Sequence, residues 1–198
     1  KIHKEPPFGT KSLPNRTTML TFFGQTVVEE ILDTLRPGCP IEYINVPLLK
    51  CDEPYDHECT GKKEIPIIRS RFDARTGTSP NNPRQQLNEI SAWIDGTLIY
   101  GPDKTVSDLL RSFKDGKLAS INDEDMYPIY NSKGMPMDNP TPPTDYPYPK
   151  NSKRFFQLGN FHGQENAMQA TIGILWFRLH NWNANRLKKL HPDWNDEK

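Results

Sequence analysis

Nineteen prolines are spread through this 198-residue chain, and they confine regular secondary structure to a few segments. Proline fixes φ and lacks a backbone N–H, so it is excluded from helix interiors and central strands. Apolar residues reach only 34%, the mean hydropathy is −0.77, and aromatic residues make up 10%. This composition is typical of a loop-rich domain or a piece of a larger one, because a disordered chain would carry fewer aromatic residues.

The apolar periodicity of helices occurs in three segments, residues 16–35, 105–113 and 166–190. Pro37 and Pro192 follow the first and the third, where helices are expected to stop. In the second, Leu109, Leu110 and Phe113 are the expected buried face. The pattern predicts three helices separated by long irregular connections, a mainly α architecture.

The composition of the connections between the predicted helices also predicts structure. Residues 39–88 are rich in Pro, Asp and Lys, and within them 41–46 and 65–68 are either short strands or merely extended. Residues 122–153 hold seven prolines, which predicts a surface insertion or a functional loop.

Charge and hydropathy exclude some classes of partner. Lys plus Arg and Asp plus Glu both total 25, so the formal net charge of zero gives no reason to expect nucleic acid or an anionic membrane surface. No stretch approaches the roughly 20 apolar residues that span a bilayer. The chain begins without Met or a signal-type apolar core, and we expect both ends to be cuts within a longer chain.

Cys39, Cys51 and Cys59 lie close together, and their spacing does not fit paired zinc ligands. A local disulfide formed in an oxidising compartment, with one thiol left over, is the better interpretation. Asn15 begins an Asn-Arg-Thr sequon, which is compatible with glycosylation of a secreted protein. It equally suits a helix N-cap, and both interpretations stay open.

Three polar groups are candidates for chemistry. Gln25, Glu29 and Glu30 interrupt the first helix, either as a buried site or, as their pattern alone favours, as a solvated stripe. Alternating oxygen-bearing residues could wrap calcium or simply form a turn at Asp95-Gly96; they are Ser91, Trp93 (through its carbonyl), Asp95 and Thr97.

The third group is the turn at 159–166, which contains His162 and Glu165 and precedes the last helix. It could bind an anion, perform acid–base chemistry or only cap the helix. His180, among aromatic residues on that helix, is more typical of a hydrogen-bonded core histidine than of a ligand.

Several motifs occur in a characteristic order: PNRTTMLTFFGQ at 14–25, CPIE at 39–42, Cys51-Asp52, Glu58-Cys59, PRQQLN at 83–88, WIDG at 93–96, IYG at 99–101, LRSF at 110–113, WFRLHN at 176–181 and HPDW at 191–194. Together they resemble the animal haem peroxidase superfamily, and most closely the peroxidase-homology domain of invertebrate dual oxidases. The resemblance covers residues 13–198, after an irregular lead-in over 1–12. It implies a mainly α, haem-peroxidase-like fold, incomplete here and limited to the distal half, with truncation at the C-terminus.

The resemblance also implies a distal catalytic group. Gln25 keeps the distal glutamine, Glu29 occupies the distal histidine position, and His162 falls where an arginine is expected. Glu165 retains one haem-esterifying carboxylate, whereas Val28 replaces the other. The proximal histidine that ligates haem iron would lie outside the chain, beyond its last residue.

A calcium loop is implied in the same way, through Ser91, the Trp93 carbonyl, Asp95 and Thr97. Its fifth ligand maps to Glu30, one methylene longer than the aspartate normally found there. FAD and NADPH would bind only to the oxidase portion, which lies outside this segment.

The implied function is that of an extracellular or lumenal peroxidase domain attached to a membrane oxidase that makes hydrogen peroxide. Its substrates would be hydrogen peroxide and small or tyrosyl donors. Because Glu29 is a weaker base than histidine and His162 is not permanently charged, we expect feeble or pH-dependent turnover in the whole domain. This segment alone should hold haem poorly and be inactive. The alternative is a catalytically degenerate module that stabilises the oxidase or contacts a maturation factor; a secreted peroxidase relative without an oxidase portion is a third possibility.

Overall fold

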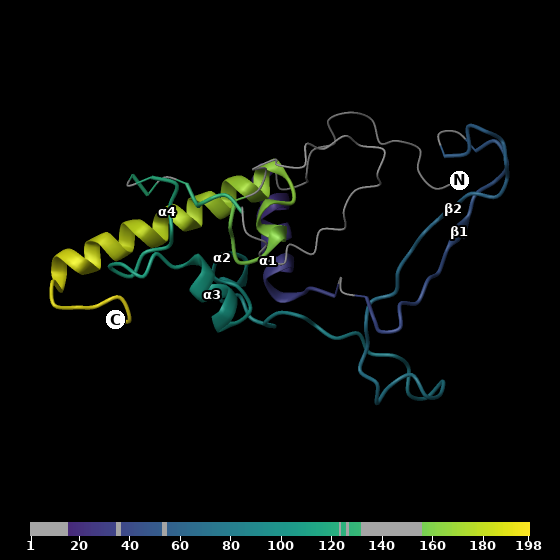
Figure 1. Cartoon of the computed structure of the whole chain (residues 1–198), viewed down its shortest axis with the longest axis horizontal. Coiled ribbons are helices and arrows are strands. Elements are labelled where there is room, and N and C mark those ends of the chain that lie inside the picture. The colour runs from purple at the N-terminus through teal and green to yellow at the C-terminus, as the bar shows by residue number, and fades with distance from the viewer. Residues whose placement is uncertain (1–15, 35–36, 53–54, 123, 126, 132–155) are drawn as a thin grey trace. The chain divides into compact units, whose positions relative to one another are not determined.

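The computed structural model of the chain describes residues 16–34, 37–52, 55–122, 124–125, 127–131 and 156–198 (Figure 1). The chain divides into two compact units, which we describe separately. Unit 1 comprises residues 1–31 and 93–198, and unit 2 comprises residues 32–92. The predicted lead-in over 1–12, the sequon residue Asn15 and most of the predicted loop over 122–153 lie outside the described residues.

Helix α4, Ala167–Leu190, is the longest element of unit 1 (Figure 1). The Asn166 side chain accepts hydrogen bonds from the backbone N–H groups of Met168 and Gln169, at 3.1 and 3.0 Å. This cap satisfies two donors that the start of a helix otherwise leaves unpaired. The predicted helix over 166–190 is therefore confirmed to within one residue.

Helices α1, Met19–Ile31, and α3, Lys104–Leu110, are shorter than the predicted segments. α3 begins where the Asp103 side chain accepts a hydrogen bond from Val106 N–H at 3.0 Å. It ends because Arg111 has extended backbone angles. The predicted buried face of this helix is wrong in part: Leu110 is buried, but the chain has left the helix by Phe113, and both Leu109 and Phe113 are exposed.

Two further elements of unit 1 have no helical periodicity in the sequence. Helix α2, Thr97–Tyr100, is one turn long, and the 3-10 helix η1, Phe161–Gln164, precedes α4. The expected number of three helices was therefore too low. α2 supplies two of the buried apolar residues of the core, which consists of Leu98, Ile99, Leu110, Leu118 and Phe177, with Val106 packed against them.

Unit 2 is largely irregular, as the sequence predicts for residues 39–88. Strands β1, Val46–Pro47, and β2, Glu64–Ile65, pair antiparallel, with Val46 opposite Ile65. An isolated bridge joins Tyr43 to Ile68, so both segments that the sequence left as short strands or extended chain contribute to pairing.

A disulfide in unit 2 joins Cys51 to Cys59, and Cys39 is an exposed free thiol. The expected local disulfide with one thiol left over is thus confirmed. The loop that it closes wraps the fully buried Asp56, whose carboxylate accepts hydrogen bonds from Gly61 N–H at 2.8 Å and from Thr60 N–H at 3.1 Å. These bonds, led by the one from Gly61, lower the pKa of Asp56 to about 2.

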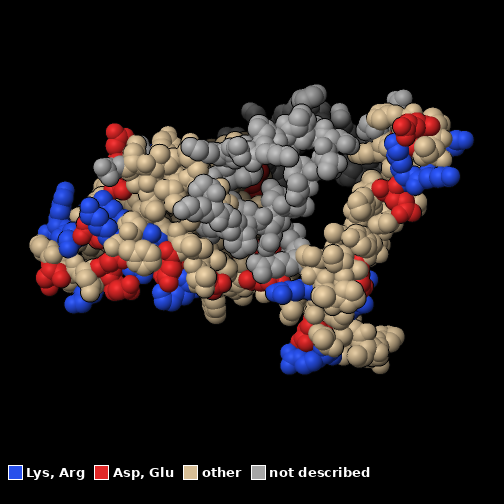
Figure 2. Space-filling model, in the orientation of Figure 1, with Lys and Arg blue, Asp and Glu red and all other residues tan. Residues whose placement is uncertain are grey.

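On the face shown in Figure 2, acidic and basic side chains are interspersed over the described parts of the molecule, in keeping with the formal net charge of zero. No helix among the described residues is both long enough and apolar enough to cross a bilayer.

Candidate functional site

Helix α1 packs into unit 1 through polar residues. Thr26 and Glu30 are its buried residues, whereas Phe23 is 55% exposed. The Thr26 hydroxyl donates to the Gln169 side-chain oxygen on α4 at 2.8 Å, and Gln169 Nε2 donates to the Phe22 carbonyl at 3.2 Å. The interpretation of Gln25, Glu29 and Glu30 as a solvated stripe is wrong for Glu30, which is buried by hydrogen bonds to the start of α2, whereas Gln25 and Glu29 are only partly buried.

Next to this contact, four predicted site residues lie together. His162 Nδ1 is 3.2 Å from Glu29 Oε2 and 3.7 Å from Glu165 Oε2. Gln25 Nε2 donates to Glu165 Oε2 at 3.1 Å, and Asn166 Nδ2 donates to Gln25 Oε1 at 3.1 Å. We call Gln25, Glu29, His162 and Glu165 the distal cluster.

Contacts within and next to η1 position the side chain of His162 in the distal cluster. The Asn160 side chain caps η1 by accepting from His162 N–H at 3.0 Å, and the Phe161 ring lies against the imidazole with centroids 4.0 Å apart. His162 is only 6% exposed. Gly163 and Gly173 let η1 approach α4, because a Cβ on Gly173 would stand 2.9 Å from the Gly163 carbonyl oxygen. These contacts place the imidazole at the edge of α1.

The predicted calcium ligands are only partly brought together. Glu30 Oε2 accepts from the N–H groups of Gly96 and Thr97 at 2.9 Å each, and Oε1 accepts from Leu98 N–H at 3.1 Å. The Thr97 hydroxyl donates to Asp95 Oδ1 at 2.7 Å.

Hydrogen bonds thus link Glu30, Asp95 and Thr97 around the start of α2. Trp93, which is 76% exposed, belongs to the same unit, and Ser91 belongs to unit 2.

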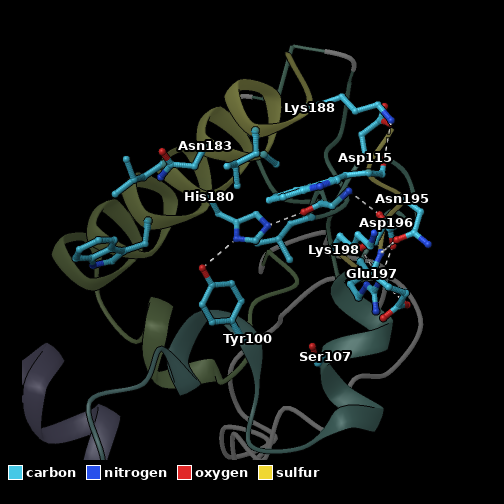
Figure 3. Close-up of a pocket in the computed structure, with 18 residues that line it drawn as sticks. Tyr100, Ser107, Asp115, His180, Asn183, Lys188, Asn195, Asp196, Glu197 and Lys198 are labelled. Atoms are coloured by element: carbon cyan, nitrogen blue, oxygen red, sulfur yellow. Dashed lines mark hydrogen bonds and ion pairs between the residues drawn. The ribbon is translucent and has the colours of Figure 1, made fainter. Parts of the chain in front are cut away.

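Sequence reasoning missed a pair between α2 and α4. Tyr100 Oη lies 3.0 Å from His180 Nδ1, and His180 Nε2 lies 2.9 Å from the Gly116 carbonyl oxygen (Figure 3). A carbonyl only accepts, so Nε2 carries a proton, and in the neutral ring the Tyr100 hydroxyl donates to Nδ1. Burial, and to a smaller extent the Glu30 charge, raise the pKa of Tyr100. The expected hydrogen bonding of His180 is confirmed, but its expected place in the core is wrong, because the residue is only partly buried and borders a pocket.

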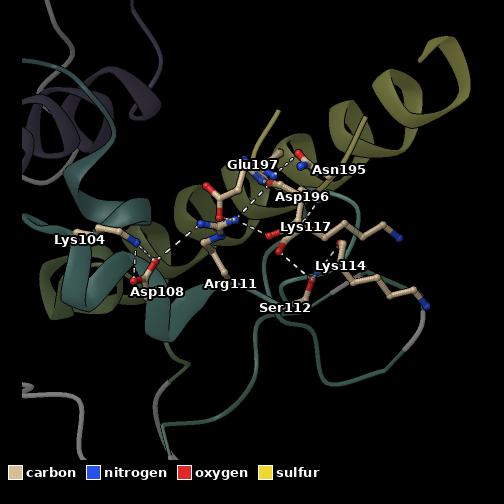
Figure 4. Close-up of polar contacts among 11 residues, drawn as sticks. Lys104, Asp108, Arg111, Ser112, Lys114, Lys117, Asn195, Asp196 and Glu197 are labelled. Carbon is tan, nitrogen blue, oxygen red and sulfur yellow. Dashed lines mark hydrogen bonds and ion pairs between the residues drawn. The ribbon is translucent and has the colours of Figure 1, made fainter. Parts of the chain in front are cut away.

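This pair borders an open pocket of about 610 Å³, which is also lined by the second half of α4, by residues 194–198 and by residues between Ser107 and Leu118 (Figure 3). Its acidic residues are already paired with cations. Arg111 binds both Asp196 and Glu197, the latter at 2.9 Å (Figure 4). Lys188 lies 3.3 Å from Asp115 (Figure 3). We place the candidate chemistry at the distal cluster instead, because an imidazole and two carboxylates converge there.

Comparison with known proteins gives a consistent result. A family model described as Animal haem peroxidase matches residues 1–198. The chain is 41% identical over 192 residues to Dual oxidase 1 of Caenorhabditis elegans and 42% identical over 190 residues to Dual oxidase of Drosophila melanogaster. Each match covers 96% of this chain but only 13% and 12% of those proteins, so the chain spans about one eighth of their length.

Among solved structures, the chain is similar to Peroxidase A from Dictyostelium discoideum. The TM-score is 0.73 at 26% sequence identity, over 90% of this chain and 35% of the other. The likeness agrees with the mainly helical, partial fold predicted from the sequence.

Proposed function

This chain belongs to the animal haem peroxidase family, and from that membership we propose that it forms the distal part of the peroxidase-homology domain of a dual oxidase. The observation that carries the proposal is the distal cluster. Two segments about 140 residues apart in sequence bring an imidazole, two carboxylates and an amide together at one edge of α1. Identity of 41–42% with two dual oxidases, spread over 96% of the chain, supports the assignment.

Haem is the cofactor that the family implies, and the residues present fit one side of it. Glu165 has a side chain that is 46% exposed, and Val28, beside Glu29 on α1, is 51% exposed. An exposed carboxylate and an exposed apolar side chain are thus both available to a macrocycle that has an apolar body and carboxylate edges. Glu165 would hold the haem edge; when bound, haem would supply the iron at which peroxide is reduced.

Glu29 and His162 would handle the protons. Glu29 would take a proton from the inner oxygen of peroxide as a general base. His162 Nδ1, 3.2 Å from Glu29 Oε2, would carry that proton or a positive charge towards the departing oxygen. Because each group already contacts the other, both must rearrange to meet peroxide, which agrees with an expectation of weak turnover.

A calcium ion would bind near the start of α2. Glu30, Asp95 and Thr97 supply oxygen atoms there, and calcium prefers oxygen ligands. Since both Glu30 oxygens accept backbone N–H groups, the ion would share this carboxylate with the helix rather than replace those bonds. Ser91 and the Trp93 carbonyl remain predicted ligands.

We place the domain on the extracellular or lumenal side of a membrane protein, in keeping with the Cys51–Cys59 disulfide. In that setting the membrane oxidase portion, with its FAD and NADPH, would supply hydrogen peroxide. Small or tyrosyl donors would be the second substrate.

Substitution of His162 in the intact protein tests the catalytic role. His162→Arg should raise kcat/KM for peroxide by about tenfold or more, because arginine adds a permanent, forked donor at the site of developing charge. Glu29→Gln should lower it, since the base is lost. His57→Ala, an exposed histidine of unit 2, is the control and should change nothing.

The second candidate is a degenerate module that stabilises the oxidase or binds a maturation factor. The contact between Glu29 and His162 favours it, because a base and an acid that satisfy each other are poorly placed for turnover. If neither His162→Arg nor Glu29→Gln alters turnover while haem absorbance is unchanged, the peroxidase role is abandoned in favour of this one.

A further inference from the structure

The distal cluster contains three potential metal ligands. Glu29, His162 and Glu165 each offer one ligand atom, and these atoms all lie within 4.8 Å of one another. We propose that the three side chains bind a divalent transition-metal ion of the zinc type, independently of haem. The proposal goes beyond the peroxidase role, because it requires neither haem nor peroxide.

The distances between ligand atoms suit such an ion. Zinc lies about 2.0–2.1 Å from imidazole nitrogen and about 2.0–2.2 Å from carboxylate oxygen. Two ligands of a tetrahedral ion at that radius are about 3.3–3.5 Å apart. His162 Nδ1 lies 3.2 Å from Glu29 Oε2 and 3.7 Å from Glu165 Oε2, on both sides of that separation. The carboxylate oxygens of Glu29 and Glu165 lie within 4.8 Å of each other, so binding would draw these two side chains together by up to about 1.5 Å.

The ligands are held in place by neighbours. His162 is 6% exposed, its backbone N–H is bound by Asn160 and its ring lies against Phe161. Gln25 donates to Glu165 at 3.1 Å, so that carboxylate has an outer-shell partner of the kind that orients metal ligands.

The side chains of the two carboxylate ligands are partly exposed, so solvent ions can reach the site. The Glu29 side chain is 16% exposed and the Glu165 side chain is 46% exposed. An ion can therefore enter from the Glu165 side, with water in the fourth position.

The ligand types select the class of metal. Calcium and magnesium prefer sites made only of oxygen, whereas an imidazole nitrogen beside carboxylates suits Zn²⁺, Mn²⁺ or Co²⁺. Two carboxylates with a neutral imidazole also match the charge of a divalent cation. The site is thus distinct in chemistry from the predicted calcium loop around Asp95 and Thr97.

Calorimetric titration of the intact, chelator-treated protein with Zn²⁺ tests the proposal. We expect one binding event. Loss of an outer-shell partner weakens metal binding about 10- to 100-fold, and we expect His162→Ala and Glu29→Gln, which remove ligands themselves, to weaken it more than that. His57→Ala and Glu58→Gln, an exposed histidine and an exposed carboxylate of unit 2, are matched controls and should bind as the parent does. No Zn²⁺ binding, or binding that both cluster variants retain, overturns the proposal.

Glu165→Gln tests the site without a risk of misfolding, because this half-exposed side chain can lose its charge without disturbing the core. It should weaken Zn²⁺ binding while the helical circular dichroism is unchanged; unchanged binding would remove Glu165 from the site. Co²⁺ provides a second readout, through visible absorption that the His162→Ala variant should lose. Neither readout depends on turnover, so this proposal and the peroxidase assignment can fail separately.

Discussion

At the scale of single residues, Glu30 is the acidic side chain that joins α1 to α2. It is 5% exposed, and its two oxygens accept three backbone N–H groups, those of Gly96, Thr97 and Leu98. Gly96 precedes α2 in the left-handed conformation, with φ of 87°, and offers no side-chain cap. A carboxylate from another helix therefore satisfies the donors at the start of α2 and places negative charge at its positive end.

Glu30→Gln should destabilise the protein by about 1–3 kcal/mol, because an amide nitrogen then faces a buried N–H that has no acceptor. Urea unfolding measures the change. Glu58→Gln, in an exposed position, is the control and should leave the midpoint unchanged. Equal midpoints for both variants would mean that the Glu30 carboxylate does not hold α2.

At the scale of elements, close backbone approach decides how the parts of unit 1 fit. The segment before η1 crosses α2 at Gly159, where an added Cβ would lie 2.1 Å from Gly101 N and 2.4 Å from the Thr97 carbonyl oxygen. Backbone atoms cannot move aside as a flexible side chain does. Gly24, within α1, has nothing within 4 Å of such a Cβ. Gly159 is therefore required for close packing, whereas a side chain at Gly24 would meet no other atoms.

Overpacking usually costs about 1–3 kcal/mol, and we expect Gly159→Ala to destabilise unit 1 by about 3 kcal/mol or more, because backbone atoms are in the way. Gly24→Ala should stabilise α1 by up to about 1 kcal/mol, since alanine is the better helix former. Thermal unfolding of the two variants beside the parent checks both signs. A tolerated Gly159→Ala would show that the segment and α2 do not approach as described.

At the scale of the whole molecule, three carboxyl groups connect the stability of unit 2 to acid. The carboxyl groups of Glu42, Asp56 and Asp73 all have lowered pKa values, and all three lie in unit 2. Asp56 is fully buried, and its pKa falls from 3.8 to about 2, first through the bond from Gly61. Because the folded value lies below the unfolded one, its ionised form stabilises the loop above about pH 4, and this contribution is lost as the pH falls through about 2.

The amide signals of Thr60 and Gly61 should therefore titrate near pH 2 in nuclear magnetic resonance spectra. Asp56→Asn should remove that titration and weaken the loop at neutral pH, where the parent is ionised. Asp52→Asn, a change of the same kind in the same loop, is the control and should leave the titration in place. A midpoint near the ordinary 3.8 would contradict the lowered pKa.

Much of the architecture follows from local sequence. The periodicity of residues 166–190 and the Asn166 cap determine α4, because helix formation and capping depend on residues within a few positions of each other. The short spacing of Cys51 and Cys59 made a local disulfide the expected link, although it could not choose the pair. Ordered motifs along nearly the whole chain pointed to the family and to the residues of the distal cluster.

Only the tertiary structure decided which side of α1 is buried and how α2 forms. The sequence pattern favoured a solvated stripe that included Glu30, yet Thr26 and Glu30 are buried and Phe23 is exposed. The reason is that hydrogen bonds to Gln169 and to the N–H groups of Gly96, Thr97 and Leu98 come from residues 66 to 143 positions away. A local pattern carries no information about such partners. It therefore predicted the helix but not which of its faces is buried.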